Sequence, residues 1–90
     1  MGKIPSASEA LLRMYVNLSR NGSAPQPGVA IVIPNEAHKI GAEALVADCA
    51  DLNLGKSEVV IITHVDPSLT TGDRLDDGRY VLLYSAPRRN

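Results

Sequence analysis

Three short aliphatic runs constrain the fold of this 90-residue chain more than any other feature. They are Val29–Ile33, Val59–Ile62 and Tyr80–Tyr84. β-Branched runs without polar alternation are typical of strands that are covered on both faces, as in a parallel sheet. A helical pattern from Glu36 to Asn53 separates the first two runs. Because a helix between two parallel strands crosses over in one hand, we predict a right-handed β-α-β unit.

The residues before the first strand predict an N-terminal helix. A capping box at Ser6–Glu9 begins this helix, and Asn21-Gly22 supplies its end. Apolar residues recur at helical spacing along one side, so we expect that side to pack on the sheet. These residues are Ala7, Ala10, Leu11, Met14, Tyr15 and Leu18.

The opposite side of this helix predicts a contact with another protein. It carries Leu12 and Val16 one turn apart, beside Arg13 and Arg20. Adjacent exposed aliphatic side chains ringed by charge are a common feature of protein interfaces. A second predicted contact lies in the charged segment after the second strand and comprises Asp73, Arg74 and Asp76.

Residues 66–78 fit either a long functional loop or one arm of a hairpin. In the hairpin, Thr70–Leu75 forms a short strand and Asp76–Gly78 turns it into the Tyr80 run, since Asp-Gly is a strong hairpin signal. Both versions place the Tyr80 run antiparallel to its neighbour. We therefore predict one α+β domain over residues 1–90. It has an N-terminal helix, a β-α-β unit and an antiparallel strand or hairpin, with two helices on a sheet of three or four strands.

Composition argues against several classes of partner. The net charge of −1 and a set of aromatic residues limited to three tyrosines disfavour nucleic acid. No apolar run approaches the length of a membrane span, and the N-terminus has no signal-peptide core, so we expect a cytoplasmic location without membrane contact. Cys49 is the sole cysteine, which excludes an intrachain disulfide and predicts a buried, inert thiol.

Polar residues able to do chemistry follow both strands of the β-α-β unit. Glu36 and His38 follow the first strand, and His64 and Asp66 follow the second. The carboxyl ends of parallel strands meet at one sheet edge, where open α/β sheets bind ligands. In a catalytic version, His64 acts as general base or metal ligand, Asp66 orients it, and Glu36 or His38 is a second acid or ligand. No cofactor or metal motif occurs in the chain, so we predict neither.

Two functions are compatible with this sequence. Small size, the lack of a cofactor motif and the Leu12–Val16 patch favour a non-catalytic interaction module, such as an accessory, adaptor or inhibitor protein. The exposed edges of a small sheet favour self-association as a homodimer. The alternative is a small-ligand-binding protein, or a small hydrolase or isomerase, that uses the His/Asp/Glu cluster.

Overall fold

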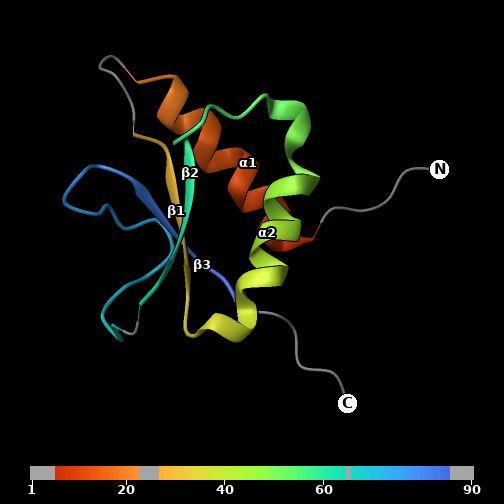
Figure 1. Ribbon diagram of the computed structural model, residues 1–90. Helices are drawn as coiled ribbons and strands as arrows, with labels where there is room; N and C mark the ends of the chain where they lie inside the picture. Colours follow the sequence, from red (N-terminus) through yellow and green to blue (C-terminus); the bar gives the residue numbers. More distant parts are fainter. Residues whose placement is uncertain (1–5, 23–26, 65, 86–90) are drawn as a thin grey trace.

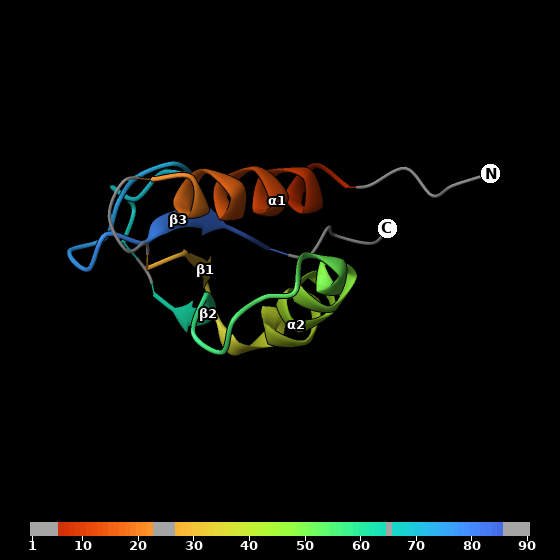
Figure 2. The same ribbon diagram turned by 90° about the horizontal axis from the view of Figure 1, so that it is seen from above.

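The computed structural model describes residues 6–22, 27–64 and 66–85. These residues form a small α+β domain in which two helices pack on one face of a three-stranded parallel sheet (Figures 1 and 2). The helices are α1 (Ala7–Arg20) and α2 (Lys39–Asp48), and the strands are β1 (Val29–Ile33), β2 (Val59–Thr63) and β3 (Tyr80–Leu83). Short 3-10 turns, η1 (Glu36–His38) and η2 (Ala50–Leu52), precede and follow α2.

The predicted β-α-β unit is confirmed. β1 and β2 are parallel neighbours, with Val29 opposite Val59 and Ile33 opposite Thr63, and α2 connects them. The sheet order is β2-β1-β3, so β1 is the central strand, and all five of its residues are buried. Val29, Ile31 and Ile33 face the helices, because they share one core cluster with apolar side chains of α1 and α2. Cys49 is buried there too, and burial raises the pKa of its thiol.

The predicted antiparallel pairing of the Tyr80 run is wrong, because β3 runs parallel to β1. β2 and β3 lie on opposite sides of β1, so the chain has to cross the whole sheet between them. The connection from β1 to β2 moves one way across the sheet, and the connection from β2 to β3 moves the other way. Two right-handed crossovers that move in opposite directions must lie on opposite faces of the sheet. Figure 1 shows the 66–79 segment on the face away from the helices. It returns the chain to the starting end of β1, which makes β3 parallel.

The hairpin prediction is correct only in the backbone contacts near the turn. The N–H of Gly72 donates to the carbonyl of Val81 at 2.8 Å, and the N–H of Leu75 donates to the carbonyl of Arg79 at 2.9 Å. A single antiparallel bridge joins Arg74 to Tyr80. Thr70–Leu75 is not a strand, so the described sheet has three strands without a hairpin arm. The segment nevertheless covers the outer edge of β3.

The predicted orientation of α1 is wrong for most of the residues named, although Leu11 and Tyr15 pack against the core as expected. Leu12 and Val16, predicted to be exposed, have 0% exposure, whereas Met14 and Leu18 are 44% and 47% exposed. The error has a physical cause, since two polar residues on the buried face satisfy their polar groups within the helix. The Ser19 hydroxyl donates to the carbonyl of Val16 at 2.9 Å, and the Glu9 carboxylate accepts from Arg13 at 3.1 Å. Leu12 and Val16 are therefore not accessible for the predicted contact with another protein.

The burial of α1 gives a matched pair of stability measurements. Leu12→Ala should lower the free energy of unfolding by about 2 to 5 kcal/mol, because it opens a cavity in the core. Leu18→Ala, the same change on the exposed side, should lower it by less than about 0.5 kcal/mol. Urea unfolding of both variants checks this, and equal losses would restore the orientation predicted from the sequence.

Gly28 fixes the point at which the chain enters the central strand. Its φ is +101°, and a Cβ built on it would lie 1.9 Å from the carbonyl oxygen of Glu58. Its own carbonyl accepts from the N–H of Tyr80 at 3.0 Å, and the next residue, Val29, donates to Glu58 at 2.9 Å. Gly28 thus lies between the entrances of β2 and β3, where only glycine fits.

Gly28→Ala should therefore destabilise the fold by at least about 2 kcal/mol, from left-handed backbone strain and the clash with Glu58. Gly55→Ala is the control, since a Cβ there meets no atom closer than 3.6 Å. Thermal unfolding followed by circular dichroism compares the two. A Gly28→Ala variant as stable as Gly55→Ala would contradict the close approach of β1 and β2.

Candidate functional site

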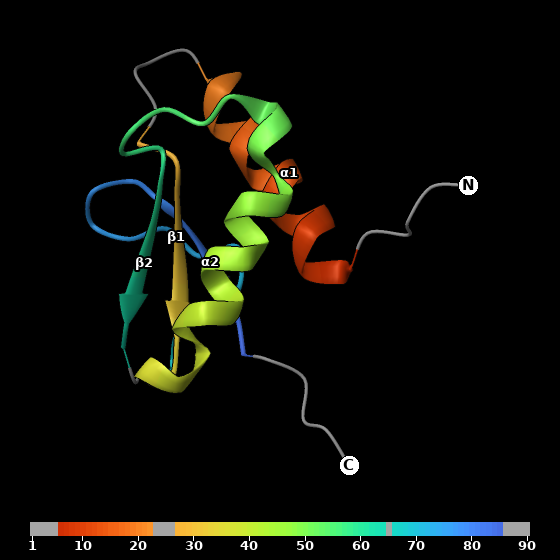
Figure 3. The same ribbon diagram turned by 45° about the vertical axis from the view of Figure 1, so that its right-hand side comes forward.

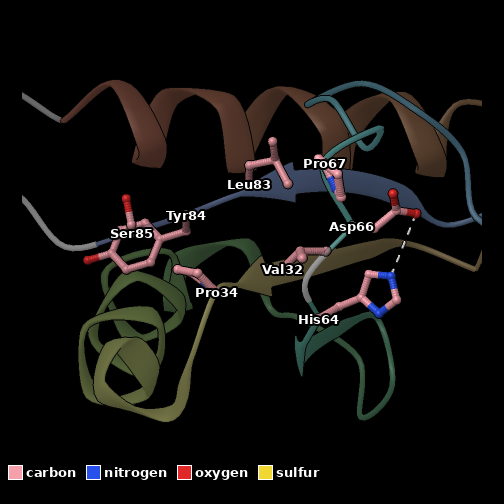
Figure 4. A pocket seen from close by; sticks show the side chains of 8 residues that line it. All are labelled: Val32, Pro34, His64, Asp66, Pro67, Leu83, Tyr84 and Ser85. Carbon is pink, nitrogen blue, oxygen red and sulfur yellow. Dashed lines mark ion pairs between the residues drawn. The ribbon is translucent and has the colours of Figure 1, made fainter.

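A cleft of about 420 Å³ opens at the carboxyl ends of the strands. Val32 and Leu83, register partners on β1 and β3, form its floor on the sheet face away from the helices. Figure 4 shows His64 and Asp66 at one end of the cleft and Tyr84 and Ser85 at the other. The full lining is Val32, Pro34, His64, Asp66, Pro67, Leu83, Tyr84 and Ser85. The cleft lies at the sheet edge that the sequence predicts.

The walls of the cleft follow from local sequence. Pro34 directly follows β1 and lacks a backbone N–H, so the ladder cannot continue through it. Asp66 begins a turn in which its carboxylate accepts from the Ser68 backbone N–H at 2.9 Å and from the Ser68 hydroxyl at 2.7 Å. These bonds to Ser68, and to a lesser extent the nearby His64, hold the pKa of Asp66 below its usual value. Asp66 is therefore an anion at neutral pH.

His64 and Asp66 meet at the end of β2 as predicted. The Nε2 atom of His64 lies 3.8 Å from Oδ2 of Asp66, and the two side chains are 49% and 38% exposed. This separation exceeds a hydrogen bond, so the contact is an ion pair only when the imidazole is protonated. The backbone N–H of His64 donates to the carbonyl of Ile33 at 3.1 Å, which holds the residue on the strand ladder.

The structure does not bring Glu36 and His38 into this cleft, since neither residue is among those that line it. The carboxylate of Glu36 accepts from the Thr63 hydroxyl at 2.6 Å. His38 is half-buried in η1. Asn35 caps this turn by accepting from the N–H of Ala37 at 2.9 Å, and the chain then leads into α2 on the other face of the sheet. Within residues 6–22, 27–64 and 66–85, no cluster of three or more His, Cys, Asp or Glu side chains suits a metal ion.

A second, more polar cleft of about 500 Å³ adjoins the first and shares His64 and Asp66 with it. Its other lining residues are Leu69, Arg74, Leu75, Asp76 and Asp77. Two of these, Arg74 and Asp76, belong to the segment in which we predicted a protein contact. The Arg74 guanidinium carbon lies 4.2 Å from the centre of the Tyr80 ring, and Nε donates to the carbonyl of Gly78 at 2.8 Å. These contacts of Arg74 hold the turn between Arg74 and Tyr80 in place. Asp73 has a similar local role, since it accepts from the Thr70 N–H at 2.8 Å.

Val32, Pro34, Pro67 and Leu83 are site residues that sequence reasoning missed. Val32 and Leu83 lie inside their strands, and Pro34 directly follows β1, so an argument based on polar groups beyond the strand ends did not include them. Leu83 is 41% exposed, which makes it an apolar floor open to solvent. Because a ligand cleft is mostly apolar with a few polar groups, the aliphatic residues near the carboxyl ends of the strands, on the face away from the helices, were the available signal.

The predicted partner residues Arg13 and Arg20 make extensive contacts within the chain. Arg13 pairs with Asp51 at 2.8 Å and donates to the carbonyl of Asp48 at 3.1 Å. Arg20 donates from Nη2 to Glu58 at 2.9 Å and to the carbonyl of Leu52 at 2.8 Å. Both guanidinium groups therefore connect α1 to the segment that runs from the last residue of α2 to the start of β2.

These contacts lower the pKa of both carboxylates that receive them. The hydrogen bond from Arg13 lowers the pKa of Asp51, and that from Arg20 lowers the pKa of Glu58. A carboxylate with a depressed folded pKa stabilises the fold above its unfolded pKa, which is about 4. That stability is lost as the pH falls through the folded pKa. The acid side of the stability profile should therefore depend on Glu58 and Asp51.

Glu58→Gln should accordingly flatten the loss of unfolding free energy as the pH falls from about 5 to 2. The measurement is urea unfolding at a series of pH values. Glu43→Gln, which removes an exposed carboxylate of α2, is the control and should keep the wild-type slope. Parallel profiles for wild type and Glu58→Gln would show that the Arg20 contact does not stabilise the fold.

Comparisons of the chain with protein-family models, with curated proteins and with solved structures each returned no match. In the part of the chain that the structure describes, no helix is both long and apolar enough to cross a membrane. The proposal of a function therefore depends on the geometry of the molecule itself.

Proposed function

We propose that the protein is a non-catalytic interaction module, of the accessory, adaptor or inhibitor kind, that self-associates by pairing strands at the outer edge of β2. The observation that supports this is the position of β2 at the end of the sheet order, where it pairs with β1 alone among the described residues. Figure 3 shows β1 and β2 pointing the same way with β2 outermost. The opposite edge, on β3, is covered by residues 72–75. In the part of the chain that the structure describes, the edge of β2 is therefore open to a partner strand.

Alternation along β2 identifies the backbone groups that face outward. The carbonyl of Glu58 and the N–H of His64 bond to β1, so residues of even number point their backbone groups inward. Val59, Ile61 and Thr63 consequently direct their N–H and carbonyl groups to the open edge. Unpaired strand edges of this kind favour the addition of another strand, since the backbone hydrogen bonds supply affinity.

A second copy of the chain fits this edge by symmetry. Antiparallel pairing about a two-fold axis through Ile61 places Val59 opposite Thr63 of the second copy and Val60 opposite Ile62. Each of these residues is β-branched, and such cross-strand pairs stabilise sheets. Val59, Val60, Ile61 and Ile62 are only half-buried in the single chain. The resulting dimer would bury part of their exposed surface within one continuous six-stranded sheet.

Thr63 offers a matched test of strand pairing. Thr63→Pro removes one outward N–H and places a proline at the end of an edge strand, where it is tolerated. Thr63→Val also loses the hydroxyl bond to Glu36 but keeps the backbone N–H. We expect wild type and Thr63→Val to dimerise at high micromolar concentration. Thr63→Pro should weaken dimerisation at least about fivefold, from the loss of edge hydrogen bonds. Light scattering coupled to size exclusion measures this.

Hydrogen exchange supplies an independent measure of the same contact. The amides of Val59, Ile61 and Thr63 should gain protection as wild-type concentration rises, while inward amides such as that of Ile62 are protected throughout. A wild-type protein that is monomeric at high micromolar concentration would refute self-association through β2.

The cleft at the strand ends supports a second candidate function, the binding of a small ligand. Its apolar floor and its polar end at His64 and Asp66 match the usual composition of ligand sites. In a catalytic version of this site, His64 would act as base with Asp66 as its orienter, while Glu36 is held by Thr63 outside the cleft lining. Binding requires fewer groups than catalysis, so this second candidate is a binding function.

A further inference from the structure

We infer that the cleft at the strand ends binds a small organic cation with an apolar body, a proposal that builds on the ligand-binding candidate. Its apolar part comes from Val32 and Leu83 on the floor and from Pro34 and Pro67 at the sides. A volume of about 420 Å³ lies within the range of small-molecule sites. The exposed Leu83 side chain gains most from such a ligand, because a bound apolar group would remove it from water.

The polar end of the cleft determines the charge of the ligand. Asp66 is held as an anion by its two hydrogen bonds from Ser68. It lies where the apolar cleft meets the second cleft, which also contains Asp76. Asp76 has no ion pair within the described residues. An ammonium group at this junction would therefore face two carboxylates.

The cations already present offset this charge only in part, since Arg74 lines the second cleft as one guanidinium against the carboxylates of Asp66 and Asp76. The Arg74 guanidinium lies over the Tyr80 ring and donates to the carbonyl of Gly78. Asp77 is occupied by Arg79, with Nε and Oδ2 3.2 Å apart. Asp66 and Asp76 thus give the junction a negative charge, which complements an amine and opposes a carboxylate. Figure 4 shows Asp66 next to the apolar floor, so one small molecule can contact both.

The experiment uses three probes with the same phenyl ring and different charge: phenethylamine, phenethyl alcohol and phenylacetate. Methyl-selective NMR of Val32 and Leu83 monitors the floor while each probe is titrated into the full chain. We expect saturable methyl shifts with phenethylamine, weaker binding of the alcohol, and the weakest binding of phenylacetate.

Substitutions then assign the charge preference to the carboxylate. Asp66→Asn keeps an acceptor for Ser68 but removes the charge, and it should weaken phenethylamine about two- to fivefold, as expected for a partly exposed ion pair. Binding of the uncharged alcohol should weaken by less than that of phenethylamine. Glu43→Gln, the same loss of charge on α2 outside the cleft, should leave all three probes unaffected.

The possible failures of this proposal are distinguishable. If no probe shifts the methyl groups of Val32 and Leu83 saturably, the ligand-binding candidate itself is refuted. If the alcohol or phenylacetate binds as tightly as phenethylamine, the cleft stands as a ligand site but the cationic class is refuted. Thr63→Pro should bind phenethylamine like the wild type, because strand pairing uses the outer edge of β2, whereas Thr63 is not among the residues that line the cleft.

Discussion

The structure depends on the double hydrogen-bond ladder of β1. This strand is paired on both edges, by β2 and β3, and its side chains are between 0% and 4% exposed. A backbone segment buried so completely has no access to water, so its polar groups require partners from neighbouring strands. The ladder therefore demands a neighbour on each edge. Both neighbours run parallel to β1, and each parallel neighbour requires a crossover connection. The first connection becomes α2 and the second becomes the 66–79 segment.

Both proposed functional surfaces are consequences of that arrangement. Three parallel strands end at one edge, and Val32, next to last in β1, forms the floor of the cleft there with Leu83, the last residue of β3. The crossover on the far face brings Asp66 and Pro67 over this floor. The same topology gives β2 a single neighbour among residues 6–22, 27–64 and 66–85, which creates the open edge. A sheet of three strands leaves both features exposed. The 66–79 segment covers only part of the face away from the helices, and of the two edges it covers only that of β3.

Residues whose partners are close in the chain or follow from simple periodicity could be predicted from the sequence. The Ser6 hydroxyl accepts from the N–H of Glu9 at 3.1 Å, which is one half of the predicted capping box, while the Glu9 carboxylate pairs with Arg13 instead. α1 ends at Arg20, with Asn21 as its C-cap. The meeting of His64 and Asp66 beyond β2 required only that the strand ended where its aliphatic run ended. Glu36 and His38 failed to join them, because the capping turn at Asn35 redirects the chain toward α2.

The local structure was set by sequence alone: three aliphatic runs became strands, and two segments with a helical pattern contain the helices. These elements depend on backbone propensity and on contacts a few residues apart, which the sequence displays directly. The buried side of α1, the direction of β3 and the composition of the cleft were decided only in the folded chain. Each depends on contacts between segments that are distant in the sequence, such as Arg13 with Asp51 or Val32 with Leu83. Apolar periodicity does not indicate these contacts, because a polar residue whose hydrogen bonds are made within the protein can be buried.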